Sequence, residues 1–257
     1  MMSQPLFILN VQTDPGQDPE ANLAQVEATI QDVKGNYSRF DLICLPEHFS
    51  LGLRKRLSQK TARWVTRRSL DSLERWARDC NSYLVGGTIP EVHGDRLYDT
   101  AFLLDRQGQV IGQYRKIHLY ADWGETAIFT PGDEAEVVDL EFTKLGLAIC
   151  RDLRFPDLFR ELRAQGAEIF CVPSMWNYPY EGDWEILGRC RALENQAYCM
   201  LTNITGIHIS EKFFGRSMVV DFRGNVISMM DDQPGYQVAQ IDLAALRKWR
   251  KTFRIFE

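Results

Sequence analysis

The stretch GLAICRDLRFPDLFREL, residues 146–162, decides the fold. Its first half is an apolar run typical of a buried strand, and its second half has the apolar spacing of an amphipathic helix. Pro156 begins that helix, a position that proline favours because its missing N–H would be unpaired there. Cys150 and the charged pair Arg151 and Asp152 lie at the junction. A strand that passes directly into a helix is typical of a layered α/β protein.

The rest of the chain repeats this alternation. Apolar runs predict buried strands at 6–11, 41–45, 83–89, 101–104, 144–149, 168–172, 198–204 and 217–221. Helical spacing predicts helices at 20–34, 69–80, 156–165, 183–197 and 243–250, with Asp183 as a candidate N-cap. The stretches 98–116 and 215–230 are typical of hairpins, so we expect mixed sheets. Because no linker or repeat divides the chain, we expect a single domain over 1–257.

The composition argues against several classes of protein. The chain has 257 residues, a formal net charge of −5 and no long basic tract, which argues against nucleic acid or a membrane as its partner and favours a small molecule. It has no run of about 18 apolar residues and no secretory leader, so we expect a cytoplasmic protein. The six cysteines include no Cys-x-x-Cys pair, which argues against a disulfide framework and against a zinc site.

Four reactive side chains follow strand-like runs, where open α/β sheets bind ligands: Glu47, Lys116, Glu125 and Cys150. A carboxyl group at 47 held against apolar walls has a raised pKa and can transfer protons near neutrality. An ammonium group at 116 fixed at a strand end can stabilise an oxyanion. Each also has an ordinary interpretation, as a solvated loop glutamate, a surface lysine or a capping residue.

Cys150 is the strongest single signal. At a strand end its sulfur would face exposed peptide N–H groups, and these together with a nearby ammonium favour the thiolate. The alternative is a buried structural cysteine, an interpretation that suits Cys44 and Cys171, which lie inside apolar runs. No histidine has an obvious orienting partner in the sequence, and the chain has neither a complete nucleophile elbow, nor a His-Glu-x-x-His motif, nor a phosphate loop.

In these residues the chain resembles the nitrilase, or carbon-nitrogen hydrolase, superfamily, whose catalytic set is a Glu, a Lys and a Cys in that order. The matching stretches span almost the whole chain: LPEHFSLG (45–52), YRKIHLY (114–120), LGLAICRDLRFPDLFREL (145–162), VPSMWN (172–177), RALENQAYCMLTNITG (191–206) and GRSMVVDFRGNVI (215–227). The short spacing from Lys116 to Glu125, followed by PGD, is similar to the ω-amidase-like branch. One departure is Arg151, where many relatives carry an aromatic residue.

This resemblance implies a four-layer α-β-β-α sandwich with mixed β-sheets, which commonly dimerises through helices that flank the sheets. The segment 183–197 would lie near that interface, although its spacing equally fits an ordinary core helix. No cofactor or metal is implied.

The resemblance also implies a reaction. Cys150 would attack an amide carbonyl, Lys116 and the N–H of Arg151 would hold the oxyanion, Glu47 would transfer protons, and Glu125 would support them. Ammonia would leave, and water would hydrolyse the thioester. The implied substrate is a short dicarboxylate ω-amide such as 2-oxoglutaramate, and the candidate substrate-binding residues are Arg151, Phe49, Trp176 and Arg154.

Four alternatives stay open at this point. The same triad could hydrolyse an N-carbamoyl or other aliphatic amide, or a nitrile. A silent binding protein on the same fold would lack a triad member, and none is missing. A metal-dependent phosphodiesterase on a similar sandwich would need clustered Asp, Asn and His ligands.

Overall fold

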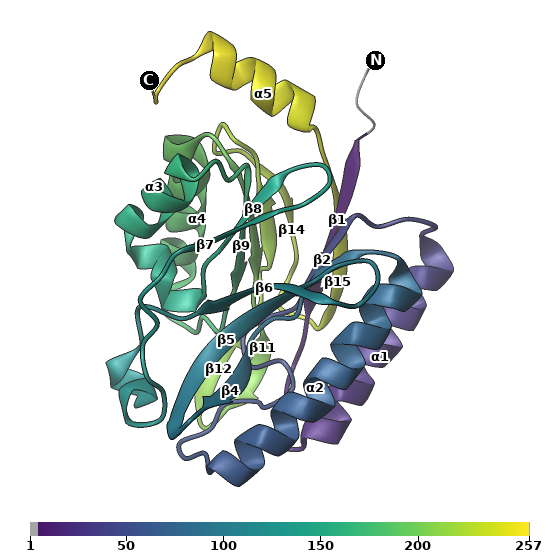
Figure 1. Cartoon of the computed structure of the whole chain (residues 1–257), viewed down its shortest axis with the longest axis vertical. Helices are drawn as coiled ribbons and strands as arrows, with labels where there is room; N and C mark the ends of the chain where they lie inside the picture. The colour runs from purple at the N-terminus through teal and green to yellow at the C-terminus, as the bar shows by residue number, and fades with distance from the viewer. Residues whose placement is uncertain (1–4, 257) are drawn as a thin grey trace.

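A computed structural model describes residues 5–256 and contains two β-sheets packed face to face, with helices on the outer side of each (Figure 1). Both sheets combine parallel and antiparallel pairs. The prediction of an α-β-β-α sandwich with mixed sheets is therefore confirmed. No helix among residues 5–256 combines the length and the apolar character needed to cross a membrane.

The first sheet has seven strands and carries the two longest helices on its outer face. Its order is β15 (Gly235–Ile241), β1 (Leu6–Gln12), β2 (Leu42–Cys44), β3 (Tyr83–Val85), β5 (Arg96–Leu104) and β4 (Ile89–His93), with β6 (Val110–Arg115) also paired to β5. The helices are α1 (Pro19–Asn36) and α2 (Gln59–Cys80), which lie side by side in Figure 1.

The second sheet has six strands and is covered by α3 (Pro156–Ala164) and α4 (Glu181–Asn195). Its order is β14 (Val226–Met229), β13 (Met218–Val220), β10 (Tyr198–Thr202), β9 (Ile169–Pro173), β8 (Lys144–Leu147) and β7 (Glu136–Asp139). A separate hairpin is formed by β11 (Thr205–His208) and β12 (Glu211–Phe214), and α5 (Leu243–Thr252) follows β15.

Alternation along the strands of the first sheet places their side chains in two different layers of the core. In β1, Ile8 belongs to the cluster between the sheets, whereas its neighbour Leu9 belongs to the cluster beneath α1 and α2. Successive strand residues point to opposite faces, so a strand with helices on one side and a second sheet on the other must be apolar throughout. Cys44 and Cys171 are fully buried in the layer between the sheets, as their apolar surroundings in the sequence predict.

Several element boundaries differ from the prediction. The helix predicted at 69–80 begins at Gln59, where Ser58 caps it by accepting a hydrogen bond from the Thr61 N–H. The α4 helix begins at Glu181, so Asp183 lies in its first turn and is not its N-cap. The strands β4, β7, β11, β12 and β15 were not predicted.

The apolar run 83–89 is broken because two glycines interrupt it. Gly87 has φ +56°, and a Cβ atom there would lie 2.0 Å from the carbonyl oxygen of Pro46. Only glycine permits such a close approach at positive φ. As a result, β3 ends at Val85, and the loop after it packs directly against the turn that carries Glu47.

Candidate active site

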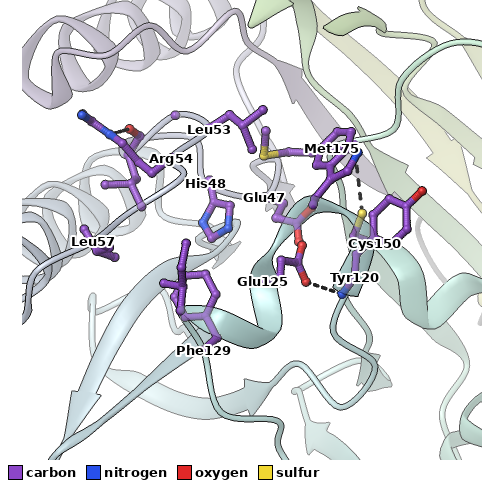
Figure 2. A pocket seen from close by; sticks show the side chains of 14 residues that line it. Glu47, His48, Leu53, Arg54, Leu57, Tyr120, Glu125, Phe129, Cys150 and Met175 are labelled. Carbon is purple, nitrogen blue, oxygen red and sulfur yellow. Dashed lines mark hydrogen bonds between the residues drawn. The ribbon is translucent and has the colours of Figure 1, made fainter. Parts of the chain in front are cut away.

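The four residues that the sequence predicts as a catalytic set meet in one place. Glu47 follows β2 and Lys116 follows β6 in the first sheet, whereas Cys150 follows β8 in the second. Glu125 begins the short 3₁₀ helix η2 (Glu125–Ala127), which lies in the connection from β6 of the first sheet to β7 of the second. Figure 2 shows Glu47, Glu125 and Cys150 side by side around one pocket.

Lys116 is the centre of the arrangement. Its Nζ donates to Glu47 Oε1 at 2.7 Å and to Glu125 Oε1 at 2.8 Å. The other oxygen of Glu125 accepts from the Tyr120 N–H at 2.7 Å. Lys116 and Glu47 are each only 1% exposed. Charge-assisted hydrogen bonds at this depth hold both partners in one geometry.

Burial sets the protonation of these two groups. It raises the pKa of the Glu47 carboxyl to about 7, against the lowering effect of the Lys116 ammonium and with additional raising by Asp99 and Glu125. For Lys116, burial alone would lower the pKa, but the Glu125 and Glu47 carboxylates outweigh it and raise the pKa well above its usual range. Lys116 is therefore a permanent cation, and Glu47 can both give and take a proton near neutrality.

Cys150 is a thiol in this environment. Burial raises the pKa of Cys150 well above its usual range, the Glu47 carboxylate adds to the effect, and the Lys116 ammonium only partly opposes it. The prediction of a stabilised thiolate is therefore wrong, because the sequence shows the nearby cation but not the burial. The Cys150 Sγ lies 3.8 Å from the Met175 carbonyl oxygen, which accepts its weak hydrogen bond.

The turn that carries Cys150 is held by a buried carboxylate. Cys150 has φ +47°, an uncommon conformation for a residue other than glycine. Asp152 accepts from the Ile149 N–H at 2.8 Å, from the Tyr114 hydroxyl at 2.7 Å and from the His118 N–H at 3.1 Å. These bonds bring the end of β8 and the end of β6 together, and so place the thiol beside Lys116.

Two cavities meet at Cys150. One is lined by Glu47, Glu125, His48, Arg54 and a largely apolar wall, and the other by Arg151, Arg154, Trp176, Asn177 and Tyr180. Both are lined by Tyr120, Cys150 and Met175. The thiol therefore stands between a cavity that holds the carboxyl groups of Glu47 and Glu125 and a cavity that holds two guanidinium groups, those of Arg151 and Arg154.

Three of the four predicted substrate-binding residues line the second cavity: Arg151, Arg154 and Trp176. The Arg151 guanidinium donates to the Leu119 carbonyl and lies over the Tyr120 ring. The Arg154 guanidinium lies 4.6 Å from the centre of the Trp176 ring and pairs with Asp183 at 2.9 Å.

Phe49 is placed differently from the prediction. It is fully buried, packs against Trp76 of α2 and lines neither of the two cavities. Although Phe49 is only two residues from Glu47, the turn directs its ring into the core beneath α2. Its contribution is to the burial of the turn, not to contact with a substrate.

Sequence reasoning missed the partners of three histidines. His48 lies 3.6 Å from Asp99, His118 lies 2.7 Å from Asp152, and His208 lies 3.0 Å from Asp14. In the first and third pairs the partners are more than 50 residues apart, so no local pattern could reveal them. Glu47, His48 and Asp99 also form a cluster of possible metal-ligand atoms, but the Lys116 ammonium already supplies the positive charge there.

Comparison with known proteins gives consistent results. Residues 10–251 match the family described as carbon-nitrogen hydrolase. The 2-oxoglutaramate amidase of Paenarthrobacter nicotinovorans is 30% identical over 236 residues, which cover 88% of this chain and 80% of that protein.

Two solved structures are similar throughout. Saccharomyces cerevisiae Nit3, a member of branch 10 of the nitrilase superfamily, matches all of this chain and 97% of its own with a TM-score of 0.88 and 27% identity. A variant of the amidase from Nesterenkonia sp. AN1, with the acetamide moiety of fluoroacetamide covalently added at the active-site cysteine, matches 96% of this chain and 94% of its own. That match has a TM-score of 0.83 and 27% identity.

Proposed function

The chain belongs to the carbon-nitrogen hydrolase family, and from that premise we propose that it hydrolyses an amide through a thioester on Cys150, with Glu47 and Lys116 completing the triad. It is a hydrolase of carbon-nitrogen bonds other than peptide bonds. The observation that carries the proposal is the buried Lys116 ammonium, bonded to Glu47 and Glu125 beside a cavity that Cys150 also lines.

Acylation begins with a proton transfer. Glu47 accepts the thiol proton as the Cys150 sulfur forms a bond to the amide carbonyl carbon. The carbonyl electron pair moves onto oxygen, where the Lys116 ammonium and the Arg151 N–H stabilise the negative charge. A base with a pKa near 7 suits this step, because Glu47 must be ionised before attack and protonated after it.

The same proton then serves the leaving group. Glu47 returns it to the amide nitrogen as the carbon-nitrogen bond breaks, and ammonia departs. Water next gives a proton to Glu47 and bonds to the thioester carbon. The carbon-sulfur bond breaks, the acid is released, and Glu47 returns the proton to Cys150. Glu125 holds Lys116 in place throughout, through the bond at 2.8 Å.

The second cavity supports a substrate with a carboxylate. Arg151 and Arg154 contribute guanidinium groups to its wall, and guanidinium is well suited to pair with carboxylates. A short dicarboxylate ω-amide such as 2-oxoglutaramate would place its amide at Cys150 and its acid group toward these arginines. The similarity to a 2-oxoglutaramate amidase agrees with this choice.

The proposal is tested by ammonia release from purified protein. The panel contains 2-oxoglutaramate, an uncharged aliphatic amide of similar length, an N-carbamoyl amino acid and an aliphatic nitrile. We expect the highest kcat/KM for 2-oxoglutaramate and no release from Cys150→Ala, whose circular dichroism spectrum should match that of the natural protein.

Each result has a defined meaning. Equal rates for the charged and uncharged amides would overturn the carboxylate assignment but not the reaction. Full activity in Cys150→Ala would overturn the thioester mechanism. Loss of activity in the natural protein after treatment with a chelator would instead favour a metal-dependent reaction.

We further propose that two copies pack through α4. Its Trp184, Arg191 and Asn195 side chains are buried within the chain, so the predicted interface does not rest on them. The outward side instead presents Ile186, 62% exposed, and Leu193, 52% exposed. Exposed large apolar side chains on one helix face favour a protein partner.

A further inference from the structure

One buried carboxyl group near the triad has no part in the reaction as described so far. Asp99 lies in β5, and its side chain is fully buried. Within residues 5–256, neither of its carboxylate oxygens makes a hydrogen bond of good geometry, and the Thr88 hydroxyl and the Glu47 carboxyl are close enough to interact with it. A buried polar group without a bond costs free energy, so its retention calls for an explanation.

The position of Asp99 relates it directly to the triad. Its Oδ2 lies 3.9 Å from the Lys116 Nζ, and its Oδ1 lies 3.6 Å from the His48 Nδ1. Glu47, His48 and Asp99 each contribute an atom to a group whose members all lie within 4.8 Å of one another. The Lys116 N–H donates to the Asp99 carbonyl at 2.9 Å, which fixes the two backbones together.

The charges in this space do not balance if every acid is ionised. Glu47, Glu125 and Asp99 surround a single ammonium, and the bonds of that ammonium go to Glu47 and Glu125. Like charges at such separations in a buried site disfavour each other strongly, and the usual outcome is that one carboxyl keeps its proton.

Histidine does not take that proton. His48 is buried, its ring stacks on Phe129, and burial lowers its pKa. The Thr88 hydroxyl lies 3.4 Å from its Nδ1 and accepts from its backbone N–H at 3.1 Å. Burial therefore disfavours a charged imidazole, and His48 lines the cavity while Asp99 does not.

We propose that Asp99 is a positioning residue for the hydrolysis: its buried carboxylate, held beside Glu47 and Lys116, keeps Glu47 able to exchange a proton near neutral pH. This rests on the proton-transfer role proposed for Glu47. The other titratable groups that face this pair are Lys116, His48, Glu125, Tyr114 and Cys150.

The pKa shifts agree in direction with this geometry. Burial raises the pKa of Asp99 to about 6, and Asp99 in turn contributes to raising that of Glu47 to about 7. An asparagine at position 99 has nearly the same shape but no charge. Without the neighbouring negative charge, ionised Glu47 is less disfavoured, so its pKa must fall.

The experiment is the pH dependence of kcat/KM for the Asp99→Asn variant. Because Glu47 must be ionised to accept the thiol proton, kcat/KM of the natural protein should fall below about pH 7. In Asp99→Asn this acidic limb should move down by about one pH unit, a typical effect of one neighbouring charge. Because Asp99 is itself ionised only above about pH 6, the effect should be largest between pH 6 and 7. At pH 6.5, kcat/KM relative to its value at pH 8.5 should then rise by about threefold.

Two variants serve as controls. Asp99→Glu keeps a carboxyl group and should keep the limb near its natural position. Asp41→Asn removes an equally buried aspartate just before β2, at the end of that strand away from Glu47. Its partners there are the Phe7 N–H, Arg39 and Arg106, and the substitution should leave the limb unchanged. Thermal melting of each variant reports folding separately from the pH profile.

The outcomes separate the two proposals. If the natural protein shows the limb and Asp99→Asn shows it at the same pH, the role of Asp99 is overturned. A uniform loss of activity at every pH with a lower melting temperature would mean a structural role only, and also overturns it. If the natural protein hydrolyses amides without any acidic limb, the role of Glu47 fails first, and that of Asp99 with it.

Discussion

At the scale of single residues, the site depends on how one buried ammonium is neutralised. Lys116 is only 1% exposed and bonds to Glu47 and Glu125 at 2.7 and 2.8 Å. Removing one partner of a buried ion pair leaves an uncompensated charge, which is strongly destabilising. The same bonds that allow Lys116 to be buried also fix its ammonium beside the cavity that Cys150 lines, where the proposed reaction needs a positive charge for the oxyanion.

Glu47→Gln should trap the acyl-enzyme. A p-nitrophenyl ester of a short carboxylic acid needs no proton for its leaving group. Losing the Glu47 charge removes one of the influences that raise the pKa of the Cys150 thiol, so hydroxide can take the thiol proton and Cys150 can still be acylated at pH 8.5. Without Glu47 to accept a proton from water, deacylation should be slowed by about 10²-fold or more. Mass spectrometry of the intact protein should then show one added acyl group.

The matched control for this trap is Glu47→Gln combined with Cys150→Ala, which should gain no mass. An acyl group found on another cysteine, or a single variant that deacylates as fast as the natural protein, would contradict the assignment of Glu47.

Prediction of single residues from the sequence worked best where a reactive side chain directly follows a predicted strand. Glu47, Lys116 and Cys150 were named from their positions after apolar runs, and the structure brings all three together. Asp99 was missed because it lies inside a strand. An aspartate within the apolar run LYDTAFLL was the signal that could have identified it. The state of the Cys150 thiol was predicted wrongly because burial depends on packing that no local pattern records.

At the scale of elements, those set by local turn residues could be predicted, whereas a strand that forms only by pairing with a distant part of the chain could not. The helix predicted at 156–165 ends at Ala164, and both predicted hairpins form, because Pro156, RQGQ and FRGN act locally. By contrast, β15 was not predicted, because Gly235 to Ile241 becomes a strand through antiparallel pairing with β1 at the other end of the chain. A partner 200 residues away leaves no periodic signal of its own.

The cysteines inside the strands should affect stability and not turnover. Cys171 of β9 is fully buried between the sheets, so Cys171→Ala leaves a small cavity and should lower the free energy of unfolding by about 1–2 kcal/mol. Urea unfolding monitored by tryptophan fluorescence measures this, and kcat/KM should stay within about twofold of the natural value.

The comparison is Cys80→Ala at the end of α2, where the thiol is only partly buried and the loss should stay below about 1 kcal/mol. Equal destabilisation by the two substitutions would contradict the expectation that the cysteine buried between the sheets contributes more to stability.

At the scale of the whole molecule, the exposed side of α4 should set the oligomeric state. Light scattering after size exclusion should give twice the chain mass of 29.7 kDa, and Ile186→Asp with Leu193→Asp should return the single-chain mass. A charge in an apolar interface must be desolvated without a partner, which opposes association.

Ile207→Asp is the matched control, because Ile207 is 72% exposed but lies on the β11–β12 hairpin. It should leave the mass unchanged. Dissociation by this variant, or a natural protein that runs as a single chain, would contradict the proposed interface.

The origin of the reactive groups in two different sheets has a wider consequence. Acid and ammonium come from strands of one half of the sandwich, and the thiol from the other. The proposed chemistry therefore depends on how the two sheets pack against each other. A small shift of one sheet would move the thiol away from the acid and the ammonium without unfolding either sheet, so the rate of turnover would report the alignment of the two sheets.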